Sequence, residues 1–150
     1  MPPALPPGVK PGCIFLHPRF YRDKVTGELK PKYLVVLAVA PGDDVVFRLL
    51  TSQSLGRPES PPCHHGDPYP SFYLDVLGGQ LGKQSWLDLR GREDYDGLRF
   101  RNDQATGILT NVTQVPETML RAVLECAAAA PDTTVVQEKA IRDQLALTRR

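Results

Sequence analysis

Residues 30–53, KPKYLVVLAVAPGDDVVFRLLTSQ, contain the pattern that decides the fold. Two apolar runs rich in β-branched residues, at 33–40 and 45–50, are separated by the short segment Pro-Gly-Asp-Asp at 41–44. Proline presets φ and glycine supplies positive φ, so this composition is typical of a tight turn. The stretch therefore predicts an antiparallel hairpin whose two strands enter the core on both faces.

Polar residues mark both ends of this hairpin. Lys30 and Lys32 lie at the start of the first strand, and Thr51, Ser52 and Gln53 lie at the end of the second. In an antiparallel hairpin, the start of the first strand and the end of the second lie side by side. We therefore expect the ammonium of Lys30 and the hydroxyl of Thr51 to be neighbours and to form an anion site.

The composition is that of an ordinary globular chain. It has 150 residues, of which 41% are hydrophobic and 23% are charged, and these values fit one domain with a substantial core. We expect a flexible proline-rich arm at 1–11 and a single domain at 12–150. The net charge of +1 creates no overall field for nucleic acid, so any site for a polyanion must be a local patch.

The number and spacing of the cysteines indicate the redox state of the cellular compartment. Cys13, Cys63 and Cys126 are an odd number with no close pairing motif, which indicates a reducing compartment rather than a disulfide framework. No apolar run approaches the length of a membrane span, and no signal segment begins the chain. The sequence therefore predicts a soluble, cytoplasmic protein without membrane contact.

The rest of the chain reads as strands first and helices last. Short strands are expected at 13–16, where His17-Pro18 would end the strand, and at 71–77, 83–89 and 107–110. A tight turn is expected at Asp96-Gly97, and a long irregular loop at 54–70. Apolar residues then recur at helical spacing from Pro116 to Pro131, and a capping-box pattern at 134–137 begins a second helix. This order predicts a mainly β fold, a small curled antiparallel sheet packed with two C-terminal α-helices.

The cluster Cys63-His64-His65 suggests a zinc site as an alternative. Structural zinc sites need four ligands in suitably spaced pairs. Cys13 and His17 could complete such a set only if the fold brought them close. We therefore expect no metal or cofactor, and a zinc-bound regulatory protein remains the third-ranked hypothesis.

Three segments of the chain resemble the PemK/MazF family of toxin endoribonucleases. These are Gly-Cys-Ile-Phe at 12–15, Lys-Pro-Lys-Tyr-Leu-Val-Val-Leu at 30–37, and Phe-Arg-Leu-Leu-Thr-Ser-Gln at 47–53. In that family a glycine-led strand and a loop precede an Arg-Pro dipeptide, which opens a valine-rich strand, and the next strand ends in a Thr-Ser or Thr-Ala step. The resemblance covers about 12–129 and consists of short motifs rather than one specific signature.

The resemblance implies a small SH3-like antiparallel barrel that forms a homodimer, with a groove for single-stranded RNA. Family members cleave RNA without a metal, because the ribose 2′-hydroxyl attacks the adjacent phosphate and leaves a cyclic phosphate. An antitoxin protein usually neutralises them by placing a disordered tail in that groove.

By the same resemblance, the catalytic residues fall on Lys30, Thr51 and, loosely, Asp88. Residues expected to contact RNA are Arg19, Arg22, Lys32, Ser52 and Gln53. Lysine at the family's arginine position is a departure, since it is a point charge and lacks the planar fork that arginine offers to two phosphate oxygens. A non-catalytic binding module on the same barrel is therefore the alternative to an endoribonuclease.

Overall fold

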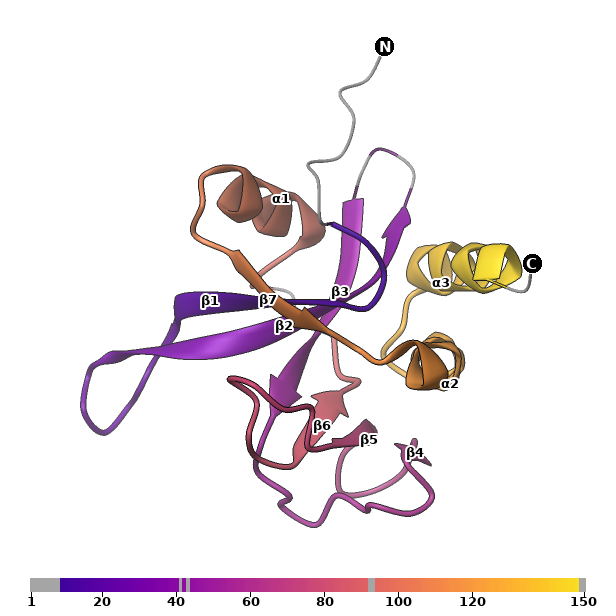
Figure 1. Cartoon of the computed structure of the whole chain (residues 1–150), viewed down its shortest axis with the longest axis horizontal. Helices are drawn as coiled ribbons and strands as arrows, with labels where there is room; N and C mark the ends of the chain where they lie inside the picture. Colours follow the sequence, from indigo (N-terminus) through magenta and orange to yellow (C-terminus); the bar gives the residue numbers. More distant parts are fainter. Residues whose placement is uncertain (1–8, 41, 43, 92–93, 149–150) are drawn as a thin grey trace.

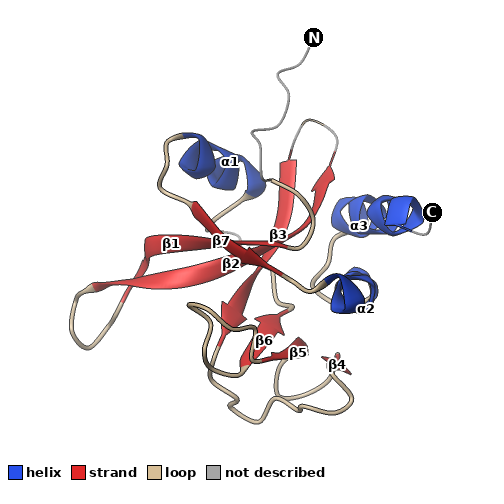
Figure 2. Ribbon diagram, viewed as in Figure 1, coloured by secondary structure: helices blue, strands red, loops and turns tan. Residues whose placement is uncertain are grey.

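The computed structural model describes residues 9–40, 42, 44–91 and 94–148, and its centre is one antiparallel sheet (Figures 1 and 2). The strands are β1 (Cys13–Arg22), β2 (Leu29–Ala40), β3 (Asp44–Thr51), β4 (Cys63–His64), β5 (Ser71–Asp75), β6 (Ser85–Asp88) and β7 (Thr110–Gln114). The helices are α1 (Gly97–Ala105), α2 (Glu117–Ala128) and α3 (Val135–Thr148). Within the sheet the strand order is β4-β5-β6-β3-β2-β1-β7.

The hairpin predicted at 30–53 is confirmed as β2 and β3. Leu34 pairs with Leu49 and Val36 with Phe47, and an irregularity follows between Val36 and Ala38. Successive residues of a strand point to opposite faces of a sheet, and on β2 both faces are buried. The hairpin therefore contributes to two separate cores, as its unbroken apolar runs predict.

Each core has its own helices. Leu34 and Val36 belong to a cluster that includes Phe100 of α1, whereas Val35 and Leu37 belong to one that includes Leu124 of α2 and Ile141 of α3. Figure 2 shows α1 apart from α2 and α3, which lie together on the other side of the crossed strands. The fold is a sheet covered on both faces.

The predicted tight turn at Asp96-Gly97 is wrong, because this pair begins α1. Asp96 is the N-cap, and its side chain accepts a hydrogen bond from the backbone N–H of Arg99 at 2.8 Å. Gly97 lies so close to β3 that a Cβ there would be 2.5 Å from the carbonyl oxygen of Val45. Asp96 therefore caps the start of the helix, and Gly97 allows the helix backbone to approach β3 closely.

Two strand predictions also need correction. The first strand does not stop at His17-Pro18 but continues to Arg22, and a shift of register between His17 and Tyr21 accommodates the proline. The last strand covers Thr110–Gln114 rather than 107–110. This strand pairs with β1, which is far away in the sequence. A local sequence pattern therefore could not predict where the strand begins and ends.

The two C-terminal helices are confirmed. Pro116 is the N-cap of α2. Thr134 and Gln137 form the reciprocal capping box of α3, because Thr134 Oγ1 accepts from the Gln137 N–H at 3.1 Å while Gln137 Oε1 accepts from the Thr134 N–H at 3.0 Å. Among the described residues, no helix combines the length and the apolar character that crossing a membrane requires.

The described strands do not form a closed barrel, since β4 and β7 are the two edges of the sheet. Residues 1–8 of the expected arm lie outside the described residues. Near the end of that arm, Val9 is buried in the core that contains Phe100 of α1, called here the α1-side core. The backbone N–H of Gly12 donates to the carbonyl oxygen of Val36 at 2.7 Å.

Candidate functional site

A groove of about 1170 Å³ lies where the end of β1, the start of β2, the end of β3 and the segment before β6 meet. Four cationic side chains line it, from Arg22, Lys24, Lys32 and Lys83. Aliphatic hydroxyl and side-chain amide groups come from Thr51, Ser52, Gln53, Gln80 and Ser85. None of its lining residues in the described part of the chain is acidic or a histidine. The groove is thus suited to a polyanion despite the near-neutral chain.

Lys32 and Thr51 lie in this groove on adjacent strands. The β2–β3 ladder ends at the pair of Leu34 and Leu49, and beyond it Lys32 and Thr51 both line the groove. The Lys32 ammonium lies 5.7 Å from the centre of the Tyr21 ring, and Thr51 Oγ1 accepts from the Gln53 N–H at 3.2 Å. A cation and a hydroxyl therefore share this groove.

Lys30, the cation expected beside Thr51, is not among the groove-lining residues. Its Nζ lies 3.3 Å from Glu28 Oε2, and its side chain is 37% exposed. On β2 it pairs with Tyr21 of β1, in the outer part of the β1–β2 hairpin. Of the two lysines at the start of β2, it is therefore Lys32 that shares the groove with Thr51.

Asp88 also lies outside the groove lining, where it holds two arginines. Arg90 binds it through Nε at 3.0 and 3.2 Å and through Nη2 at 2.7 Å, and Arg57 Nη2 lies 3.7 Å away. Burial alone would raise the pKa of Asp88, but the hydrogen bonds and charges of Arg90 and the charge of Arg57 outweigh it and hold that pKa below its usual value. The carboxylate is thus ionised and committed to an ion-pair network.

Arg57 connects this network to the groove. Its side chain is only 3% exposed, and its Nη1 donates to the carbonyl oxygen of Gln53 at 3.0 Å. Its guanidinium carbon lies 4.6 Å from the centre of the Tyr69 ring, and that of Arg90 lies 4.5 Å from the same centre. Desolvation lowers the pKa of Arg57, and Asp88 opposes that shift. Arg57 therefore braces the segment that follows Thr51.

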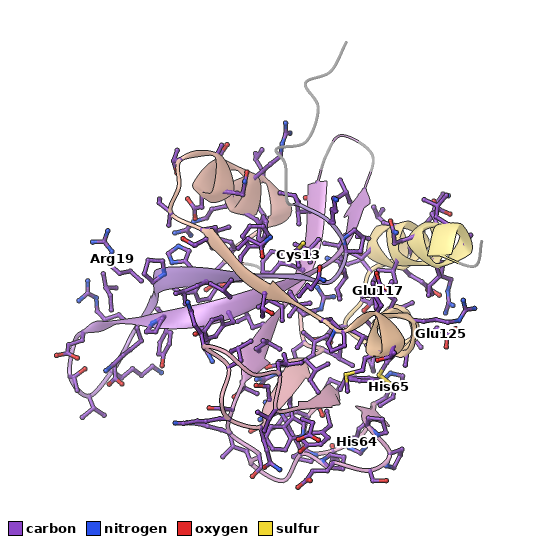
Figure 3. All side chains as sticks on the ribbon, viewed as in Figure 1. Cys13, Arg19, His64, His65, Glu117 and Glu125 are labelled. Carbon is purple, nitrogen blue, oxygen red and sulfur yellow. A yellow bond between two sulfur atoms is a disulfide. The ribbon has the colours of Figure 1, made fainter. Side chains whose placement is uncertain are left out.

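The other expected RNA contacts divide into two groups. Arg22, Ser52 and Gln53 line the groove. Arg19 does not, and Figure 3 shows it projecting away from the body of the molecule. Sequence reasoning missed Lys24, Lys83 and the brace Arg57, because no local pattern connects these positions, which the fold brings together from separate segments.

The cysteines give the clearest correction. Cys63 of β4 and Cys126 of α2 form a disulfide across a sequence separation of 63, so the absence of a pairing motif did not mean the absence of a pair. Figure 3 shows the bond between the two sulfur atoms beside His65. The Nε2 of His65 lies 3.5 Å from Cys63 Sγ, 3.4 Å from Cys126 Sγ and 2.9 Å from the Cys126 carbonyl oxygen.

Of the set considered for zinc, Cys63 and His65 lie together, but the structure does not bring His64, Cys13 or His17 to them. His64 makes a short contact through Nε2 with the carbonyl oxygen of Asp67, and Cys13 is buried in the α1-side core. His17 Nε2 lies 3.5 Å from Asp103 Oδ2, and burial lowers the pKa of its imidazole although Asp103 opposes that shift.

Comparison of the chain with protein-family models, with curated proteins and with solved structures finds no match.

Proposed function

We propose that the groove binds single-stranded RNA and that Lys32 and Thr51 promote its cleavage without a metal. The observation that carries the proposal is the placement of both residues in one groove that contains four cations and no carboxylate among its described lining residues. RNA phosphates bind such a surface through charge, and aromatic rings such as those of Tyr21 and Tyr33 offer faces on which unpaired bases stack.

The chemistry is an internal transfer of the phosphate. The 2′-oxygen forms a bond to phosphorus while the bond from phosphorus to the 5′-oxygen breaks, and the products are a cyclic phosphate and a free 5′-hydroxyl. Water accepts the proton of the 2′-hydroxyl. Lys32 stabilises the charge that develops on the phosphate oxygens, donates a proton to the leaving 5′-oxygen and regains one from water. The Thr51 hydroxyl donates a hydrogen bond to the same phosphate.

The resemblance to toxin endoribonucleases extends this proposal. In the extended proposal, the curled sheet is an open relative of the SH3-like barrel and the active species is a homodimer. An antitoxin protein binds in the groove and inhibits the activity. We place the action in the cytoplasm, where the substrate RNA is found. Each of these points follows from the family and stands apart from the groove geometry.

The test is incubation of the full chain with a long single-stranded RNA in the presence of a chelator. We expect discrete fragments that end in cyclic phosphate. Lys32→Ala and Thr51→Ala should each lower the cleavage rate by about 100-fold or more, the usual effect of removing a group that stabilises an oxyanion. Lys30→Ala is the matched control on the same strand, and its rate should stay within about threefold of the unmodified chain, as for an exposed ion pair.

The alternative function is a binding module that uses the same groove without chemistry, and lysine in place of the family's arginine favours it. Retention of intact RNA on the protein over a wide range of protein concentration would establish this alternative. If the protein neither cleaves nor binds the RNA, both the endoribonuclease and the binding-module proposals are overturned. A rate that falls for Lys30→Ala but not for Lys32→Ala would return the catalytic role to Lys30.

A further inference from the structure

Three metal-ligating side chains converge where the 54–70 loop meets α2. Cys63 and His65 come from the loop and its short strand β4, and Cys126 comes from the buried face of α2. The Sγ atoms and the ligating nitrogen all lie within 4.8 Å of one another. None of the three contributes to the groove, so this cluster needs a role of its own.

The spacing between imidazole and sulfur already matches a metal site. Tetrahedral zinc holds sulfur at about 2.3 Å and nitrogen at about 2.0–2.1 Å, which places a sulfur and a nitrogen ligand about 3.5 Å apart. The observed distances from His65 Nε2 to the two Sγ atoms are 3.5 and 3.4 Å. The imidazole nitrogen therefore already lies within reach of both sulfur atoms at the separation that a shared metal ion requires.

We propose that the reduced protein binds one Zn²⁺ through Cys63 Sγ, Cys126 Sγ and His65 Nε2, and that this state replaces the disulfide. Two molecules of a small thiol supply two electrons and two protons, which convert the disulfide to two thiols, and they leave as a disulfide of their own. A phosphine supplies the two electrons and becomes the phosphine oxide, with water providing its oxygen and both protons. Zinc binding then releases both thiol protons to solvent, so two thiolates balance the charge of the ion. A water molecule fills the fourth position.

The histidine must change its tautomer to serve as a ligand. In the disulfide state, the distance of 2.9 Å from His65 Nε2 to the Cys126 carbonyl oxygen fits an Nε2–H that donates. Metal binding requires the Nε2 lone pair, so the proton moves to Nδ1, an exchange that neutral imidazole undergoes readily in water. His65 is exposed, and its ring is therefore open to both solvent protons and an arriving ion.

The consequence is a cross-link that survives reduction. Both the disulfide and the metal join the loop to α2 across the same sequence separation of 63. A reducing cytoplasm keeps cysteines as thiols, and zinc would then hold the loop where the disulfide holds it under oxidising conditions. The loop carries Arg57, which braces the groove at Gln53, so the metal would preserve the groove wall.

The experiment uses the full chain in two states, reduced with a phosphine and oxidised to the disulfide. Each is mixed with Zn²⁺, freed of excess metal and analysed for zinc. We expect about one zinc per reduced chain and less than about a tenth per oxidised chain, because only thiolates ligate. Co²⁺ added to the reduced chain should give the sulfur-to-metal absorption of a tetrahedral thiolate site.

Variants identify the ligands. His65→Ala should weaken zinc binding to the reduced chain by at least about tenfold, as loss of a ligand does. His64→Ala is the matched neighbour and Cys13→Ser the matched cysteine, and both should bind zinc like the unmodified chain. Equal zinc content in the reduced and oxidised states would overturn the proposal, as would equal losses in His65→Ala and His64→Ala. The comparison of two redox states needs no variant, so it decides the matter even if a variant fails to fold.

Discussion

The buried guanidinium of Arg57 lies 3.7 Å from the carboxylate of Asp88, and the same guanidinium donates to the main chain of Gln53. An ion pair outside the groove therefore positions one of the groove's walls. Asp88, which the family resemblance suggested as a positioning or base residue, lies outside the groove lining and is paired with Arg57.

Asp88→Asn should destabilise the protein by about 3 kcal/mol, because the change leaves the buried charge of Arg57 without its partner. Urea unfolding of the variant and of the unmodified chain measures the difference. Asp143→Asn removes a carboxylate from an exposed pair with Lys139, and as a control it should change the free energy of unfolding by less than about 0.5 kcal/mol. Equal effects of the two substitutions would contradict the assignment.

The same carboxylate should make stability depend on pH. The folded state lowers the pKa of Asp88, so its contribution is fully present above the unfolded value of about 3.9 and is lost as the pH falls through the folded pKa. The difference in unfolding free energy between the unmodified chain and Asp88→Asn should therefore shrink as the pH falls below about 4. A series of urea titrations at decreasing pH measures this difference. A difference that increased as the pH fell would contradict a lowered pKa of Asp88 in the folded state.

RNA binding should weaken with salt in proportion to the cations of the groove. Lys83→Ala removes one of the four, so the slope of the logarithm of the binding constant against the logarithm of salt concentration should fall by about 0.7 for a single-stranded ligand. Fluorescence anisotropy of a labelled RNA at several salt concentrations gives this slope. Lys139→Ala, on the exposed face of α3, should leave the slope unchanged.

Gly97→Ala should destabilise the fold by about 1–3 kcal/mol, the usual range for overpacking. The new Cβ would meet the backbone N and O of Val45 at 2.6 and 2.5 Å, and backbone cannot rotate away as a side chain can. Thermal or urea unfolding measures the loss. Gly82→Ala has no neighbour within 4 Å of its new Cβ and should be close to neutral, so a neutral Gly97→Ala would show that α1 can move away from β3.

The hairpin and the last two helices could be predicted because their signals are local. Apolar runs with a turn between them, and a capping box before an apolar face, act within a few residues of themselves. The start of α1 could not be predicted in this way. Asp96-Gly97 is typical of a turn, and only the contact with Val45 shows that the glycine is required by the neighbouring strand.

The candidate site was harder to predict than the fold. Lys30 and Lys32 lie two residues apart on one strand, so alternation alone assigns them to the same face. Only the folded structure separates them, because Lys32 lines the groove whereas Lys30 does not and is paired with Glu28. Cys63 and Cys126 lie close together because the sheet brings β4 close to α2, and their spacing in the sequence does not predict this contact.

Strand β2 supplies Leu34 to one core and Val35 to the other. Sliding this strand by a single residue against β3 would exchange the two sets of side chains, so that each helix layer would meet surfaces shaped for its counterpart. We therefore expect the two layers to fold as one cooperative unit, so that a destabilising substitution on either face of the sheet weakens both.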